Sequence, residues 1–172
     1  MPRQPNFFVA NDASKLGMGG FWVTSHTSHP RNYLWRQPFP DNIPQMLLTN
    51  SNPSGTVSNS DLELAAIILG TALVAQRRST AHANTALAMD NTSALSWIKK
   101  GSATSSSTNA YLLHLLAQFG CATLYNITPV FTSGSSNVIA DCFPRLFYMS
   151  DVEFCSYMNS NFPVQPSCTH PT

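Results

Sequence analysis

Four acidic residues, Asp12, Glu63, Asp90 and Asp141, each lie where an apolar segment meets a turn or the start of a helix. Acidic residues are scarce in this chain, which contains 8 Asp and Glu in 172 residues. Residues at the ends of strands and helices can converge at one edge of a sheet, so these carboxylates are candidates for a single cluster. Carboxylates without His or Cys beside them suit hard divalent cations. The pattern therefore predicts metal-assisted phosphodiester chemistry.

Three of the four acids also have an ordinary structural explanation. Asp12 follows an apolar run and suits a turn. Ser60 and Glu63 have the spacing of a helix capping box, and Asp90 precedes a short helix that it can cap. Asp141 lies in an apolar segment, where an acid has no obvious structural role. The hypothesis of a metal site therefore depends on the four residues together.

The composition describes a globular chain with an unusually weak charge. Hydrophobic residues make up 43% of the sequence, and charged residues make up 10%, against about 25% in typical domains. The net charge of +1 gives no general attraction for nucleic acid. The basic residues include two pairs, Arg77-Arg78 and Lys99-Lys100. Binding of phosphate must therefore depend on a few local basic side chains or on a neighbouring module.

Cysteine spacing and the N-terminus indicate the expected compartment. The four cysteines lack Cys-x-x-Cys spacing, which disfavours a zinc site and favours reduced thiols. The first residues contain no apolar signal segment, and no apolar run is long enough to span a bilayer. We therefore expect an intracellular protein, cytoplasmic or nuclear, with no membrane partner.

The first half of the chain predicts three strands and a helix. Apolar runs at 7–10, 21–23 and 33–35 predict the strands, and the glycines of 17–20 predict a hairpin between the first two. Residues 38–58 are rich in Pro, Gly, Asn and Ser and predict a long connecting loop, which we interpret as an insertion. Apolar residues at i, i+3 and i+4 predict a helix over 60–78.

The second half alternates strands with helices. The expected elements are a strand at 84–89, helices at 94–98 and 111–119 separated by a polar break at 102–108, and a strand at 124–131. Pro129 makes that strand an edge or bulged strand. Asn137 can cap a last helix that contains Asp141, and Pro144 predicts a kink just after it.

This order predicts an α/β fold. Three strands joined early pair antiparallel, and strands that then alternate with helices add in parallel. We expect a mixed five-stranded sheet, with three antiparallel strands and then two parallel ones, and helices on both faces. One domain over 1–150 and a poorly ordered, proline-containing tail over 151–172 complete the prediction.

Four segments of this sequence carry a family resemblance. They are Asp12-Ala13-Ser14 with the glycines of 17–20, the helix start from Asn59 to Ile67, the segment from Met89 to Leu95, and the segment from Gly134 to Asp141. In this order they resemble the motifs of the ribonuclease H family, in the form attached to retrotransposon reverse transcriptases. The resemblance covers roughly residues 6–148, outside the 38–58 insertion.

The resemblance implies a ribonuclease H-like fold and a metal-dependent endonuclease that hydrolyses the RNA strand of RNA–DNA hybrids. Asp12, Glu63, Asp90 and Asp141 correspond to the catalytic, metal-binding acids, which hold two Mg²⁺ ions, with Mn²⁺ as an alternative. The polar residues beside these motifs become candidates for contacts with the hybrid: Ser14, Asn59, Ser60, Asn91 and Thr92. Their amides and hydroxyls can recognise the RNA 2′-OH. A reverse transcriptase domain in the same polyprotein is a further expected partner.

Departures from the family leave an alternative open. Many family members carry a His before the last helix, but residues 132–136 contain none, and residues 99–111 hold few basic side chains. A catalytically weak or inactive module of the same fold, binding nucleic acid or a protein, is the second hypothesis. Other readings fit less well. Proofreading exonucleases need Asp-x-Glu in the first strand, integrases end on Glu, and the glycines of 17–20 precede a strand, unlike those of a dinucleotide site.

Overall fold

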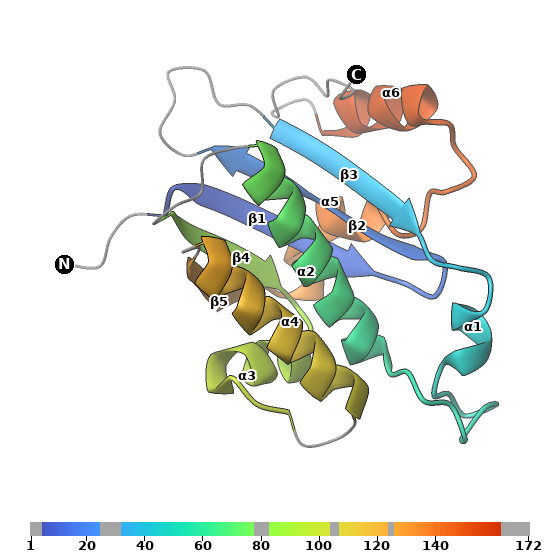
Figure 1. Ribbon diagram of the computed structural model, residues 1–172. Coiled ribbons are helices and arrows are strands. Elements are labelled where there is room, and N and C mark those ends of the chain that lie inside the picture. The colour runs from blue at the N-terminus through green and yellow to red at the C-terminus, as the bar shows by residue number, and fades with distance from the viewer. Residues whose placement is uncertain (1–4, 25–31, 78–82, 104–106, 124–125, 163–172) are drawn as a thin grey trace.

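The computed structural model describes residues 5–24, 32–77, 83–103, 107–123 and 126–162. These residues form a five-stranded sheet of order β3-β2-β1-β4-β5 (Figure 1). Its strands are β1 (Phe7–Ala13), β2 (Gly17–Thr24), β3 (Asn32–Pro38), β4 (Asn84–Met89) and β5 (Asn126–Phe131). β1, β2 and β3 pair antiparallel, whereas β4 and β5 add in parallel. The predicted mixed sheet is confirmed.

Helices cover both faces of this sheet, as predicted (Figure 1). One face carries α2 (Asn59–Arg77) and α4 (Ser107–Thr123), with α3 (Thr92–Lys100) beside them. The other face carries α5 (Val138–Cys142) and α6 (Asp151–Asn161). The short helix α1 (Ile43–Met46) precedes α2, and a 3-10 turn at Gly134–Ser136 precedes α5. No helix in the described part of the chain is long and apolar enough to cross a membrane.

The alternation of side chains along β1 sorts the core into two layers. Val9 pairs with Trp22 and both pack beneath α2 and α4, whereas Ala10 pairs with Phe21 and both pack beneath α5 and α6. Successive residues of a strand point to opposite faces, so neighbouring residues serve different layers.

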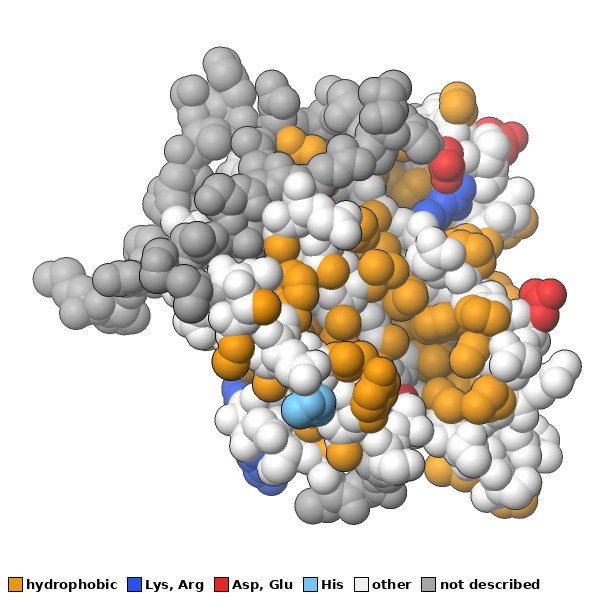
Figure 2. Space-filling view, viewed as in Figure 1, with side chains coloured by type: hydrophobic (Ala, Val, Ile, Leu, Met, Phe, Trp, Pro, Cys, Tyr) orange, Lys and Arg blue, Asp and Glu red, His pale blue; other side chains and the backbone are white. Residues whose placement is uncertain are grey.

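The surface on the α2 side displays few charged side chains (Figure 2), in keeping with the charged content of 10%.

The segment 38–58, predicted to be a long connecting loop, contains regular structure. It contains α1 and a bridge between Leu47 and Val57. Both of these residues are buried in a third apolar cluster that also holds Ala13, Leu62 and Ala66. This segment thus packs where β1 ends and α2 begins.

The expectation of a poorly ordered tail is wrong for residues 151–161. They form α6, which begins with a capping box between Ser150 and Glu153 and buries Phe154 and Met158. An apolar pair at i and i+4 behind a capping box is a helix signal that the proline content of the tail obscured. Residues 163–172 lie outside the described residues.

The last part of the chain also departs from two local expectations. α5 ends at Cys142, so Pro144 follows the helix instead of kinking it. Asn137 occupies the N-cap position of α5, but its side chain makes no capping hydrogen bond. Strand β5 begins at Asn126, and residues 124–125 of its predicted range lie outside the described residues. β5 is the last strand of the sheet, which agrees with the edge position expected for Pro129.

Candidate metal centre

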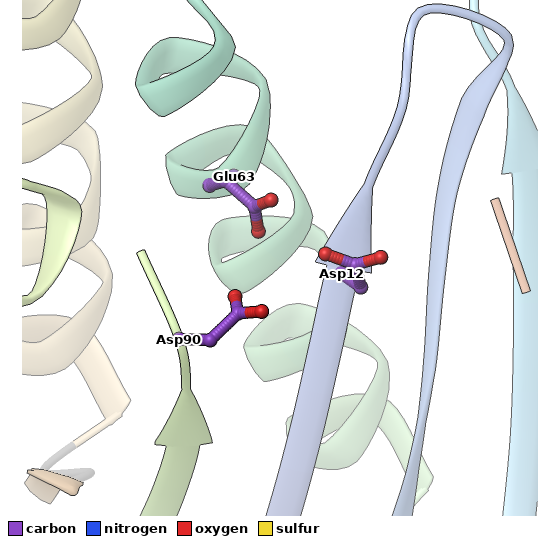
Figure 3. A group of neighbouring side chains, drawn as sticks. All are labelled: Asp12, Glu63 and Asp90. Carbon is purple, nitrogen blue, oxygen red and sulfur yellow. The ribbon is translucent and has the colours of Figure 1, made fainter. Parts of the chain in front are cut away.

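Three carboxylates meet beside the carboxyl ends of the inner strands β1 and β4. Asp12, Glu63 and Asp90 each offer an oxygen, and these oxygens all lie within 4.8 Å of one another (Figure 3). The strand register explains two of the three positions. Ala10 of β1 pairs with Ala88 of the parallel strand β4, and Asp12 and Asp90 each lie two residues further on. The carboxyl ends of neighbouring parallel strands therefore deliver both acids to the same place.

Glu63 reaches this place from the first turns of α2, and it does not cap that helix. The helix begins at Asn59, and the capping interaction is made two residues earlier than predicted. Asp61 Oδ2 accepts hydrogen bonds from the Ser58 amide at 2.7 Å and the Ser58 hydroxyl at 2.8 Å. The predicted Ser60–Glu63 capping box is therefore wrong, and Glu63 has no capping duty.

Asp90 is likewise not the cap of α3. The N-cap is Asn91, whose Oδ1 accepts a hydrogen bond from the Ala94 amide at 3.0 Å. The Ser60 hydroxyl donates to the same Asn91 oxygen at 3.1 Å. This bond ties the start of α2 to the start of α3, and so holds the segments that carry Glu63 and Asp90 together.

Burial makes the cluster electrostatically costly. Burial is the largest cause that raises the pKa of Asp12 from 3.8 to about 6, with Asp141 and Asp90 raising it further and a hydrogen bond from Glu63 opposing the rise. Burial, followed by the charge of Asp12, raises the pKa of Glu63 from 4.5 to about 10. Glu63 is therefore the proton donor in the hydrogen bond between the two carboxyls. Crowded carboxyls keep a proton when no cation neutralises them.

The donor set fits a hard divalent cation. The three ligand atoms are all carboxylate oxygens, and Asp12 and Glu63 are 5% and 4% exposed, so water does little to neutralise them. Oxygen-only sets of this kind suit Mg²⁺ and Mn²⁺ better than softer metals. The cluster is thus compatible with divalent metal binding.

Asp141 approaches the cluster from the opposite face of the sheet. It lies on α5 and is close enough to Asp12 for a hydrogen bond between the two carboxyls. It is not part of the group of three, and its Oδ1 accepts from Arg145 Nε at 2.9 Å and Arg145 Nη2 at 2.5 Å. Asp12 therefore has Glu63 on one side and Asp141 on the other. The predicted four-carboxylate cluster is observed as three acids with a fourth, ion-paired acid beside them.

The position of α5, and with it Asp141, depends on the glycines of β2. Phe143 is fully buried directly after α5. A Cβ atom at Gly19 would lie 2.5 Å from Phe143 Cβ and 2.8 Å from the Trp35 carbonyl oxygen. Only glycine allows this close approach, because real Cβ atoms do not come within 3 Å of such neighbours.

The five residues expected to contact substrate differ in their hydrogen bonds and in their exposure. Ser60 and Asn91 are bonded to each other. The Ser14 hydroxyl donates to the Pro144 carbonyl at 2.6 Å and accepts from the Leu16 amide, so it holds the turn after β1. Asn59 and Thr92 are exposed. The last two flank the Ser60–Asn91 pair and are the most accessible to a ligand.

Two contacts near the site were not anticipated from the sequence. A Cβ atom at Gly134 would lie 3.1 Å from Asp90 Oδ2, so the turn before α5 closes on the cluster. Arg145 forms an ion pair with Asp141. The i, i+4 spacing of an acid and a base in the sequence could have predicted this pair.

Comparison with solved structures gives the same fold. LC11-RNase H1, isolated from compost by a metagenomic approach, aligns with a TM-score of 0.51 and 14% identity over 80% of this chain and 91% of that chain. Its complex with an RNA/DNA hybrid aligns with a TM-score of 0.53 and 13% identity over 80% of this chain and 92% of that one. The N-terminal RNase H domain of a Mycobacterium tuberculosis protein, fused to maltose-binding protein, aligns with a TM-score of 0.53 and 15% identity over 80% of this chain and 94% of that one. No protein-family model and no curated protein sequence matches the chain. The chain therefore has a ribonuclease H-like fold.

Proposed function

We propose that this protein is a metal-dependent endonuclease of the ribonuclease H type, which hydrolyses the RNA strand of RNA–DNA hybrids. The observation that carries the proposal is the convergence of Asp12, Glu63 and Asp90 on a ribonuclease H-like fold. The capping duties that would otherwise explain two of these acids belong to Asp61 and Asn91. Glu63 and Asp90 therefore have no capping role, and the proposed metal site gives them a functional one.

In this proposal each acid has a distinct place. Asp12 is the central ligand, with Glu63 and Asp90 on one side and Asp141 on the other. Two Mg²⁺ ions held by this set supply activation of water and neutralisation of charge on the phosphodiester. Glu63 must lose its proton when it becomes a ligand, because carboxylates bind cations in their ionised form. Asp141 takes part in competition with Arg145, which bonds to its Oδ1.

We assign recognition of the hybrid to the polar residues beside the cluster. Asn59 and Thr92 are exposed, and each is the chain neighbour of one member of the bonded pair Ser60 and Asn91. Hydroxyl and amide groups of this kind can bond the RNA 2′-OH, which distinguishes RNA from DNA. Ser14 belongs to the same proposed set, but its hydroxyl already bonds to Pro144, so we expect its contribution to be the smallest.

We infer the biological setting from the sequence motifs. The segments that contain Glu63 and Asp141 resemble those of retrotransposon ribonuclease H domains, which suggests that the chain derives from a retroelement polyprotein with a reverse transcriptase as its neighbour. Hybrids formed by reverse transcription lie inside the cell, in the cytoplasm or nucleus. The low net charge of +1 agrees with a domain whose substrate is delivered by a neighbouring module.

The activity can be tested with four end-labelled substrates of one sequence: an RNA–DNA hybrid, duplex RNA, duplex DNA and single-stranded RNA. Each is incubated with Mg²⁺, Mn²⁺ or EDTA. We expect cleavage of the RNA strand of the hybrid only, in either metal, and loss of cleavage in Asp12→Asn and Asp90→Asn. Asp41→Asn is the matched control, because Asp41 is exposed in the insertion. An inert wild-type protein, or full activity in Asp12→Asn, would refute the proposal.

One observation supports a second candidate, a module that binds hybrids without cutting them. Asp141 is engaged by Arg145 and stands outside the group of three carboxylates. Fluorescence anisotropy with the labelled hybrid distinguishes the two candidates. Hybrid binding by a wild-type protein that shows no cleavage in Mg²⁺ or Mn²⁺ would favour the binding module.

A further inference from the structure

Arg145 is placed where it competes with a cation for Asp141. Its guanidinium donates through Nε and Nη2 to the same carboxylate oxygen, Oδ1 of Asp141. The side chains of Arg145 and Asp141 are 63% and 45% exposed, so the pair lies at the rim of the cluster. Exposed ion pairs are weak, roughly two- to fivefold in an equilibrium constant. A divalent cation can therefore replace the guanidinium.

The other neighbour of Asp141 makes this competition relevant to the site. Asp141 and Asp12 interact through a hydrogen bond and through their charges, and Asp12 belongs to the group with Glu63 and Asp90. A cation beside that group can use Asp12, Glu63 and Asp90 without disturbing Arg145. A cation between Asp12 and Asp141 would share the Asp141 carboxylate with the guanidinium, which already bonds to its Oδ1. The guanidinium therefore lowers the affinity of this position for a cation.

We propose that Arg145 sets the affinity of the second cation position, the one between Asp12 and Asp141, by acting as the counterion of Asp141 until a metal replaces it. The inference rests on the proposed function, because it assumes that the carboxylates bind divalent cations. The two cation positions then fill unequally. The position of Asp12, Glu63 and Asp90 fills first, and the position that includes Asp141 fills at higher metal concentration.

Mn²⁺ binding measures this directly and needs no substrate. The purified protein is titrated with Mn²⁺ and followed by electron paramagnetic resonance of free Mn²⁺ and by calorimetry. We expect wild type to show a tighter and a weaker position. Arg145→Gln should strengthen the weaker one roughly two- to fivefold, the contribution of an exposed ion pair, and should leave the tighter one nearly unchanged.

A double-mutant cycle separates pairing with Asp141 from a general effect of charge. If Arg145 acts through Asp141, Arg145→Gln has no effect on Mn²⁺ affinity in an Asp141→Asn background. If Arg145 acts only as a nearby positive charge, Arg145→Gln raises the Mn²⁺ affinity equally in both backgrounds. That result would overturn the inference. Lys15→Gln removes another exposed positive charge, three residues after Asp12, and should leave the weaker position unchanged.

The remaining outcomes separate this inference from the proposed function. Two Mn²⁺ positions with equal affinities in wild type and Arg145→Gln would overturn the role of Arg145 alone. Absence of any Mn²⁺ binding by wild type would overturn the metal centre itself, and the role of Arg145 with it. Circular dichroism of each variant checks that the fold is intact, as expected for substitutions at exposed positions.

Discussion

Ser58 and Asp61 close the N-terminus of α2 through reciprocal hydrogen bonds. The Asp61 carboxylate accepts from the amide and hydroxyl of Ser58, and the Asp61 amide donates to the Ser58 hydroxyl at 3.2 Å. Because this pair satisfies the helix start, Glu63 one half-turn later places its carboxyl in the carboxylate cluster instead. Two acids two residues apart therefore have unrelated roles, one in stability and one in the candidate metal site.

Substitution of these two acids should have opposite effects. Asp61→Asn weakens the helix cap and should lower the free energy of unfolding by about 1 kcal/mol, while Mn²⁺ affinity remains close to wild type. Glu63→Gln removes a carboxyl whose ionisation is opposed by burial, so the metal-free protein should keep or gain stability and lose Mn²⁺ affinity. Urea denaturation in EDTA and calorimetric titration measure the two quantities. Equal loss of metal binding in both variants would contradict the assignment.

The stability of the metal-free protein should fall as the pH rises. The pKa values of Asp12 and Glu63, about 6 and 10, exceed the ordinary 3.8 and 4.5, so above about pH 4 the folded protein holds more protons than the unfolded chain. Each group that binds a proton only in the folded state lowers the free energy of unfolding by about 1.4 kcal/mol per pH unit.

The steepest loss should lie between about pH 4 and 6, where both groups contribute, with Glu63 alone continuing it at higher pH. Urea denaturation in EDTA across this range measures the slope, and Glu63→Gln should flatten it. Saturating Mg²⁺ should stabilise the protein more at pH 8 than at pH 5, because the cation binds the ionised carboxylates. A wild-type slope identical to that of Glu63→Gln would show that Glu63 does not titrate as described.

Gly19 should tolerate no side chain. Gly19→Ala places a Cβ atom against Phe143 and the Trp35 carbonyl oxygen and should cost about 1–3 kcal/mol of stability. It should also weaken the second Mn²⁺ position, because Phe143 follows α5 and Asp141. Gly101→Ala is the control. Gly101 has φ +64 and no neighbour within 4 Å of the added Cβ, so it should cost stability without changing Mn²⁺ binding.

Arg36 should anchor the C-terminal segment to the sheet. Its guanidinium donates to the Leu146 and Met149 carbonyls at 2.8 and 2.7 Å and lies 4.6 Å from the centre of the Phe154 ring. Arg36→Lys retains the charge but loses the planar set of donors, and should lower the free energy of unfolding by about 2 kcal/mol.

The matched control for Arg36 is its acidic partner. Asp151 is 56% exposed and pairs with Arg36 at 2.7 Å, so Asp151→Asn should cost less than about 1 kcal/mol. Both variants are compared by urea denaturation. A greater loss for Asp151→Asn than for Arg36→Lys would show that the ion pair, and not the bonds to the two carbonyls, holds α6 in place.

Gly134 should influence the cluster through Asp90. The added Cβ of Gly134→Ala lies 3.1 Å from Asp90 Oδ2, so the carboxylate must shift by a few tenths of an ångström. We expect Mn²⁺ affinity to fall severalfold, with stability unchanged within about 0.5 kcal/mol. Ser135→Ala, in the same turn and exposed, is the control and should bind Mn²⁺ like wild type. Unchanged affinity in Gly134→Ala would show that Asp90 adjusts freely.

Much of the architecture could be predicted because it follows from local patterns. Apolar runs separated by turn residues predicted the strands, and their order predicted a mixed sheet, which is confirmed. The position of Asp12 and Asp90 at strand ends predicted that they meet, because parallel strands bring equivalent ends together. α6 was missed because the prolines that follow it outweighed its capping box and apolar pair.

The sequence by itself determined the identity and order of the four acids and the order of the strands and helices that carry them. It did not determine which acids cap a helix or form an ion pair and which are left to bind a metal. Ser58 with Asp61 and Ser60 with Glu63 have the same capping-box spacing, and only the observed start of α2 selects the first pair. The tertiary structure likewise paired Asp141 with Arg145 and brought Gly134 against Asp90. Such choices depend on distances between separate segments, which a linear pattern does not contain, whereas strand alternation and helix periodicity depend on neighbours along the chain.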